Sequence, residues 1–310
     1  MFPHLALALA FAIPSSAAPV RDAHLSIIID DRPRTYLLHI PSVSPDKPLP
    51  LVIVLHGGGQ SGKGAERFTG FNALADREGF IVAYPDAIAQ RWNDGRETTK
   101  AAKKGVDDVR FIRELIAQIS KEHNVDPHRI YATGPSNGGF MTHRLACDLS
   151  DVLAAAGPVI AGFPLDYRDS CRPAKPISII MIQGTADKLV PFNGGQVGGK
   201  GHWGAGGKTD SAENTRAFWA EREDCKAPPE AADLPDEAND GTKVRKYAYT
   251  GCQSGVEVVQ YVVDGMGHRW PTKHAPLRRH GVVTWMLGPT STNIDASEVT
   301  WKFFESHPKP

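Results

Sequence analysis

Six short, largely apolar runs constrain the fold of this chain more than any other feature. The clearest is Leu51 to Leu55, which contains no polar side chain. A strand has this composition when helices cover both faces of its sheet, as they do in parallel sheets. The other five runs are Phe80 to Ala83, Arg129 to Ala132, Val152 to Val159, Ile177 to Ile182 and Val256 to Val263.

Segments with helical spacing separate these runs. In one segment Ile112, Ile116 and Ile119 repeat every three or four residues and form an apolar stripe. Strands alternating with helices predict an α/β fold with a doubly wound, mostly parallel sheet. Two β-rich runs, Leu25 to Asp30 and Thr35 to Ile40, predict an antiparallel pair at its N-terminal edge. The expected helices cover Glu66 to Arg77, Val106 to His123, Gly138 to Leu149, Ser211 to Glu223 and Ala296 to Ser306.

Two stretches interrupt this alternation. Asn193 to Lys208 is rich in glycine and contains His202 and Trp203, whereas Lys226 to Gly241 is rich in proline and acidic residues. Long loops in a compact domain are usually functional or mobile. We expect the first stretch to form a wall of the site and the second to be plain surface.

The N-terminus has the pattern of an export signal. The apolar run from Leu5 to Ile13 is too short to cross a bilayer, and small residues follow it from Ser15 to Ala18. Residues 1–18 are therefore predicted to be a signal peptide, and residues 19–310 a single α/β domain.

The charge balance indicates what kind of partner the chain binds. Lys plus Arg and Asp plus Glu are equal at 35 each, so no net field attracts nucleic acid or an anionic membrane. We expect a polymeric or small neutral substrate and a monomeric protein.

Four cysteines allow three disulfide pairings. In an oxidising compartment Cys147 with Cys171 and Cys225 with Cys252 are favoured, because each pair closes a short loop. Neither C-x-x-C nor H-E-x-x-H occurs, so the sequence predicts no metal site and no cofactor.

A candidate nucleophile lies between a predicted strand and a predicted helix. Gly134 to Gly138 matches G-x-S-x-G with Ser136 at its centre. A nucleophile on such a sharp turn needs small neighbours, because the turn approaches other strands closely. The N-terminus of the following helix favours developing negative charge. Ser136 is therefore predicted to be the nucleophile; the alternative is a Gly/Ser turn that merely caps the helix.

Acyl transfer also requires hydrogen-bond donors for an oxyanion. One donor is usually the N–H of the residue after the nucleophile, here Asn137, and the second comes from a loop after an earlier strand. His56 to Gln60 follows the first buried strand, and Gly58 is the predicted donor, with His56 packed beneath the loop. The competing interpretation is a phosphate-binding loop, but Gly64 stands where the magnesium-binding Ser or Thr would be.

A serine nucleophile needs a histidine base and a carboxylate that orients it. Asp187 and His268 each follow a buried strand, in the Ser, acid, His order of α/β-hydrolases. The alternatives are a turn aspartate and a surface-loop histidine, with Asp264 as the reserve acid.

Five motifs together resemble the secreted polyhydroxybutyrate depolymerase and feruloyl esterase-like family of carbohydrate esterases. The similarity extends from about Thr35 to the C-terminal DASEVTWKFFESHP. The chain departs from the family pattern at Pro135, before the serine, and at Met266 and Arg269 around the histidine. The motifs are LHGGGQ at 55–60, RWNDGR at 91–96, VDPHRIYATGPSNGGF at 125–140, IQGTADKLVPF at 182–192 and GMGHRWP at 265–271.

The resemblance implies an extracellular serine esterase that acts on polymer-linked esters, either hydroxyalkanoate polyesters or hydroxycinnamoyl groups on plant polysaccharide. It implies the triad Ser136, Asp187 and His268 and places the oxyanion loop at Gly58. Trp92 and Trp270 are candidate walls for a flat or apolar substrate group, because aromatic rings offer a large contact area; ordinary core tryptophans are the alternative.

Two other functions remain compatible with this sequence. One is a serine peptidase on the same fold, and the other is a non-catalytic polymer-binding protein that keeps the fold. The filled triad positions favour the esterase.

Overall fold

The structure is a computed structural model that describes residues 22–42, 47–198, 206–273 and 286–309. The predicted signal peptide, and His202 and Trp203 of the glycine-rich stretch, lie outside the described residues.

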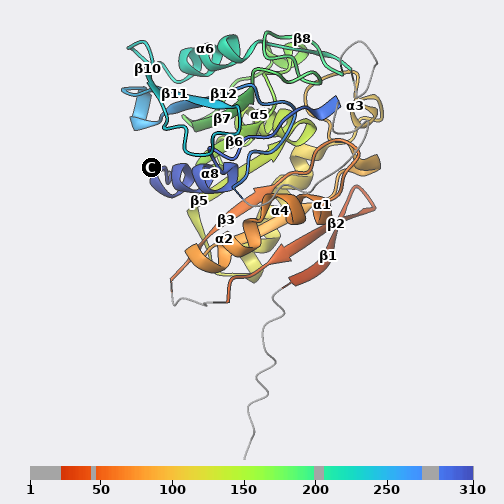
Figure 1. Cartoon of the computed structure of the whole chain (residues 1–310). Helices are drawn as coiled ribbons and strands as arrows, with labels where there is room; N and C mark the ends of the chain where they lie inside the picture. The colour runs from red at the N-terminus through yellow and green to blue at the C-terminus, as the bar shows by residue number, and fades with distance from the viewer. Residues whose placement is uncertain (1–21, 43–46, 199–205, 274–285, 310) are drawn as a thin grey trace, which may run out of the picture.

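One ten-stranded sheet forms the centre of the molecule. Its strands are β1 (Asp22–Ile29), β2 (Arg32–His39), β3 (Leu49–Val54), β4 (Ile81–Pro85), β5 (Val125–Pro135), β6 (Ala155–Val159), β7 (Ser178–Gly184), β10 (Glu230–Asp233), β11 (Lys243–Tyr249) and β12 (Val258–Asp264). Their order across the sheet is β1-β2-β4-β3-β5-β6-β7-β12-β11-β10, and Figure 1 shows the edge with β1 and β2 at the bottom and the edge with β11 and β10 near the top. The six strands from β4 to β12 in this order are parallel, as the apolar runs predict. A separate pair, β8 (Gly195–Gln196) and β9 (Lys208–Thr209), is antiparallel.

The sheet has antiparallel strands at both edges. At the N-terminal edge β1 pairs with β2, which confirms the prediction. At the other edge β11 pairs antiparallel with β12, and β10 with β11. The prediction that Lys226 to Gly241 is only a surface loop is therefore wrong, because β10 lies within it. All four β10 side chains are exposed, so the strand lacks the apolar alternation that marks a buried partner.

Helices cover both faces of the sheet. The α-helices whose bounds lie within the described residues are α1 (Gly62–Thr69), α2 (Phe71–Glu78), α3 (Lys100–Lys103), α4 (Asp108–Glu122), α5 (Asn137–Asp148), α6 (Ala212–Arg222) and α8 (Ala296–Ser306). The single helix predicted from Glu66 to Arg77 is two helices in the structure. Gly70 ends α1 with φ at 70°, a left-handed conformation that glycine adopts without a steric cost. Three short 3₁₀ turns occur at η1 (Ile88–Gln90), η2 (Leu165–Tyr167) and η3 (Gln253–Gly255).

The two faces of the sheet build two apolar cores. Along β3 the side chains of Leu51 and Ile53 enter one core, and those of Val52 and Val54 enter the other. Residues of α4, α5 and α6 complete the first core, and residues of α1, α2 and α8 complete the second. Because both faces of β3 are covered, its whole run is apolar, whereas a strand covered on one face would alternate.

Two disulfides join the pairs that loop length favours, Cys147 with Cys171 and Cys225 with Cys252. In the part of the chain that the structure describes, no helix has the length and apolarity needed to span a bilayer.

Candidate active site

Ser136 occupies a strained turn between β5 and α5. Its backbone has φ at 56° and ψ at −120°, a combination that non-glycine residues rarely adopt. A Cβ atom on Gly134 would lie 2.4 Å from the carbonyl oxygen of Leu55, and one on Gly138 would lie 2.5 Å from the same oxygen. The turn therefore packs directly on the end of β3, and this contact requires the two glycines of G-x-S-x-G.

The candidate acid and base lie at the edge of the sheet where this turn lies. Ser136, Asp187 and His268 follow β5, β7 and β12, which are parallel strands of one sheet, so all three stand at their carboxyl ends. The Ser136 N–H donates to the carbonyl of Val159 at the end of β6, which lies between β5 and β7. Residues far apart in the sequence thus meet at one edge.

Asp187 and His268 form a hydrogen-bonded pair. The distance from His268 Nδ1 to Asp187 Oδ2 is 2.7 Å. Both residues are 8% exposed, and the backbone N–H of His268 donates to the carbonyl of Leu287. With Nδ1 donating to the carboxylate, Nε2 carries a lone pair that can take a proton. The reserve acid Asp264 instead accepts a hydrogen bond from the Thr185 hydroxyl.

Ser136 lies at the same sheet edge as His268, but in the described part of the chain the two side chains are not hydrogen-bonded. Among the described residues, no hydrogen bond links the Ser136 hydroxyl to the His268 imidazole. Catalytic hydrogen bonds of this kind are often long in the free enzyme and tighten when substrate binds. The structure thus joins acid and base and places the candidate nucleophile at the same edge of the sheet.

The two candidate oxyanion donors have open N–H groups. Within the described ranges, neither the Gly58 N–H nor the Asn137 N–H has a hydrogen-bond acceptor, although the next N–H in the loop, on Gly59, donates to the carbonyl of Gln90. A Cβ on Gly58 would lie 3.5 Å from Asn137 Cβ, so the two residues are neighbours. Open N–H groups side by side suit an oxygen that becomes negative during reaction.

His56 supports this loop from below. Its Nδ1 donates to the carbonyl of Gly57 at 2.8 Å, and its Nε2 accepts from the Ala87 N–H at 3.0 Å. Burial lowers the pKa of His56, which keeps the ring neutral as this bonding requires. The predicted packing role therefore fits the contacts.

Sequence reasoning missed a charged cluster that holds Asn137. The Asn137 side chain accepts the Trp92 N–H at 2.9 Å and donates to Asp94 Oδ2 at 2.5 Å. Asp94 also forms a buried ion pair with Arg96 at 2.5 Å. The position of RWNDGR could have revealed this cluster, because its charged residues follow β4 and so lie at the carboxyl edge of the sheet.

Neither candidate tryptophan wall is open to a substrate. Trp92 has no exposed surface, and its indole N–H donates to the carbonyl of His56. Trp270 is 7% exposed and packs edge-on against Phe68 and Phe71. The substrate-wall prediction is wrong for Trp92, because a fully buried ring cannot contact a ligand, and the contacts of Trp270 are those of a core residue.

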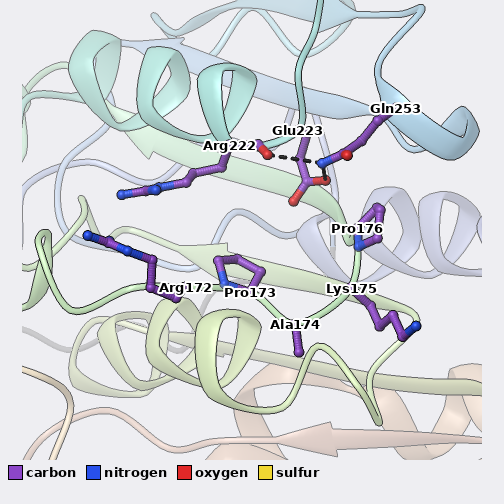
Figure 2. A pocket seen from close by; sticks show the side chains of 8 residues that line it. All are labelled: Arg172, Pro173, Ala174, Lys175, Pro176, Arg222, Glu223 and Gln253. Carbon is purple, nitrogen blue, oxygen red and sulfur yellow. Dashed lines mark hydrogen bonds between the residues drawn. The ribbon is translucent and has the colours of Figure 1, made fainter.

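A cavity of about 260 Å³ lies away from these groups. Pro176 precedes β7 and Gln253 precedes β12, whereas Asp187 and His268 follow those strands, so the cavity is at the opposite edge of the sheet. Figure 2 shows the Glu223 side chain extending between the end of α6 and the 172–176 segment. The lining residues are Arg172, Pro173, Ala174, Lys175, Pro176, Arg222, Glu223 and Gln253.

The fold and this arrangement define an α/β-hydrolase. A solved acetyl xylan esterase from Aspergillus awamori has the same fold, with a TM-score of 0.57, 14% identity, and coverage of 88% of this chain and 94% of that one. The family model described as Esterase PHB depolymerase matches residues 34–167. NocK of Nocardia uniformis subsp. tsuyamanensis, a protein assigned as an esterase, is 33% identical over 91% of this chain and 85% of its own length. The chain belongs to this esterase family and is a carboxylic ester hydrolase.

A second relative is longer than this chain. Feruloyl esterase B of Piromyces equi is 34% identical over 232 residues, which are 72% of this chain but 40% of the relative. The chain therefore spans less than half the length of that esterase.

Proposed function

We propose that this esterase is an exported enzyme that cleaves polymer-linked esters through Ser136, His268 and Asp187. The observation that carries the proposal is the 2.7 Å contact between His268 Nδ1 and Asp187 Oδ2, at the sheet edge where Ser136 occupies a strained strand-to-helix turn. This pairing supplies a base with a fixed tautomer, which a serine hydroxyl needs in order to react near neutral pH.

In the proposed mechanism Ser136 Oγ attacks the ester carbonyl carbon while His268 Nε2 takes the hydroxyl proton. The carbonyl oxygen becomes an oxyanion and accepts the N–H groups of Gly58 and Asn137. As the tetrahedral intermediate collapses, the proton on His268 passes to the leaving alcohol. Water then attacks the acyl-enzyme and gives a proton to His268; as the second tetrahedral intermediate collapses, His268 passes that proton to Ser136 Oγ, which releases the acid and regenerates free Ser136. Asp187 keeps its hydrogen bond to Nδ1 and stabilises the transient imidazolium.

Two kinds of polymer ester follow from the relatives. The family model that matches the chain is described as Esterase PHB depolymerase, where PHB is polyhydroxybutyrate. A relative with 34% identity is named as a feruloyl esterase. We therefore propose hydroxyalkanoate polyesters and feruloyl or other acyl esters of plant polysaccharide as the substrate classes. Rates on methyl ferulate, a hydroxybutyrate oligomer and acetylated xylan, measured side by side, will rank them.

Export is supported by the cysteines. All four are paired in two disulfides, and such bonds persist in oxidising compartments, whereas the cytosol keeps thiols reduced. Mass spectrometry of protein recovered from the culture medium or periplasm would identify the N-terminus, which is expected at Pro19.

The catalytic proposal is tested with Ser136→Ala and a chromogenic short-chain ester. The variant is expected to lose at least about 10³-fold in kcat and to stop reacting with a serine-directed phosphonate. Ser170→Ala, on the exposed loop after η2, is the matched control and should keep both properties. Wild-type protein that is folded but inert to every ester and to the phosphonate would indicate a polymer-binding protein instead. Release of amines from aminoacyl substrates would indicate a peptidase.

A further inference from the structure

Arg91 places a guanidinium directly over the candidate oxyanion loop. A Cβ atom on Gly58 would lie 2.4 Å from Arg91 Nη1 and 3.2 Å from its Cζ. The same Cβ would lie 3.5 Å from Asn137 Cβ. The cation therefore occupies the space that a side chain at position 58 would fill, next to both candidate oxyanion donors.

The backbone on either side of Arg91 is tied to the site. The Ala87 N–H donates to His56 Nε2 at 3.0 Å, and the Gln90 carbonyl accepts the Gly59 N–H at 2.9 Å. On the other side, the Trp92 N–H donates to Asn137 Oδ1 at 2.9 Å. Arg91 is thus held between the oxyanion loop and the residue after the nucleophile.

This anchored segment is also strained. Ala89 and Gln90 have φ at 53° and 57°, two consecutive left-handed residues that are not glycine. Such conformations cost free energy and persist only where the surrounding structure enforces them. The strain lies immediately before Arg91, so the fold sets the backbone position of this residue against local preference.

In the part of the chain that the structure describes, no carboxylate forms an ion pair with Arg91. The nearby carboxylate of Asp94 is shared between Arg96 and the Asn137 amide. Arg91 itself makes no ion pair or hydrogen bond through its guanidinium with any other described residue. It is half-buried, and burial, followed by repulsion from Arg96, lowers the pKa of Arg91 despite an opposing attraction from Asp94. An unpaired, partly desolvated guanidinium gains most from a ligand that brings the missing negative charge.

We propose that Arg91 forms an anion subsite of the active site, which selects esters carrying a carboxylate a few bonds from the scissile carbonyl. The proposal rests on the proposed function, because it places this subsite beside the oxyanion donors of Ser136 catalysis. The guanidinium offers a planar set of donors that matches a carboxylate in a bidentate manner. Half-esters of dicarboxylic acids and oligoesters with a free carboxyl end have the required chemistry.

The test compares two substrates with one leaving group. 4-Nitrophenyl butyrate is neutral, and the mono-4-nitrophenyl ester of succinic acid carries a carboxylate on an acyl chain of the same number of carbons. The readout is the ratio of kcat/KM for the anionic ester over that for the neutral one. In Arg91→Gln this ratio is expected to fall by about 10- to 100-fold, mainly through KM, because a charge-assisted hydrogen bond is lost.

Two further variants make the result specific. Arg91→Lys keeps the positive charge but lacks the planar pair of guanidinium donors. Its kcat/KM ratio should therefore lie between those of Arg91→Gln and the wild type. Arg32→Gln removes an exposed cation at the N-terminal sheet edge and should leave the ratio at the wild-type value. Raising the salt concentration should lower the ratio for the wild-type enzyme and have little effect on Arg91→Gln.

The outcomes separate this inference from the proposed function. If Arg91→Gln changes the ratio by less than about threefold while Ser136 still reacts with a phosphonate, the anion subsite is refuted and the esterase mechanism stands. Equal losses on both substrates would mean that Arg91 serves a step common to them, which also overturns the subsite. A wild-type protein that hydrolyses neither ester and resists the phosphonate would refute both proposals.

Discussion

The carboxylate of Asp187 binds His268 with one oxygen and the backbone with the other. Oδ2 lies 2.7 Å from His268 Nδ1, and Oδ1 accepts the N–H groups of Leu189 and Val190 at 2.8 Å each. Three hydrogen bonds therefore fix the plane of the carboxylate before any substrate arrives. A carboxylate held in this way orients the imidazole without having to rearrange during the reaction.

Asp187→Asn is expected to lower kcat by about 10³- to 10⁴-fold while the protein stays folded. The amide can donate to Nδ1 and thereby stabilises the wrong tautomer, with the proton on Nε2. Steady-state kinetics on a chromogenic ester, with circular dichroism for folding, measures this. Asp264→Asn, at the exposed reserve acid that ends β12, is the control and should keep near wild-type activity; the reverse pattern would make Asp264 the catalytic acid.

Gly138→Ala should destabilise the protein by about 2–3 kcal/mol, because the new methyl group overpacks a rigid contact. Its Cβ would lie 2.5 Å from the carbonyl oxygen of Leu55 and 2.7 Å from that of His56, and both are backbone atoms that cannot swing away. Gly64→Ala is the matched substitution inside α1, where the nearest atom is at 3.8 Å. It should stabilise by about 0.5–1 kcal/mol through helix propensity. Urea denaturation compares the two, and equal effects would argue against the close packing of the serine turn.

Glu223 should make the stability of the fold depend on pH. Burial raises the pKa of Glu223 from its ordinary 4.5 to about 7, and its Oε1 has no hydrogen-bond partner among the described residues. The folded protein therefore holds a proton that the unfolded chain releases, so the free energy of unfolding falls as pH rises from 4.5 to about 7. The full loss is at most about 3 kcal/mol.

Glu223→Gln should abolish most of that pH dependence, because glutamine is neutral throughout the range. Chemical denaturation at pH 5 and pH 8 measures it for both proteins. A wild-type protein as stable at pH 8 as at pH 5 would show that the Glu223 carboxylate is accommodated in its charged form.

The two disulfides should each contribute about 3 kcal/mol by restricting the unfolded chain. Their cysteines are separated by 24 residues for Cys147–Cys171 and by 27 for Cys225–Cys252, so similar loops are closed. Replacing both cysteines of either pair with serine should lower the guanidinium midpoint by a similar amount. Adding a reductant should then affect the single-disulfide variants less than the wild type. A midpoint that does not change would mean that the bond is absent in the purified protein.

The sequence by itself determined the features that depend on a residue and its near neighbours. Apolar runs marked the buried strands, because a strand covered on both faces tolerates few polar side chains. Gly134 and Gly138 marked the serine turn, and Asp187 and His268 were found because they directly follow such strands. The N-terminal antiparallel pair and the disulfide partners were likewise predictable from short segments.

Only the tertiary structure decided which groups meet and which are covered. The exposed strand β10 had no apolar pattern to reveal it, because an edge strand is held mainly by backbone hydrogen bonds to its neighbour. Trp92 looked like a substrate wall until its indole was found beneath the oxyanion loop. That Arg91 forms no ion pair with any described residue is equally invisible in the sequence, where RWNDGR offers a nearby aspartate. Burial and charge pairing are properties of contacts between distant segments, and the order of residues along a chain does not specify how those contacts are shared.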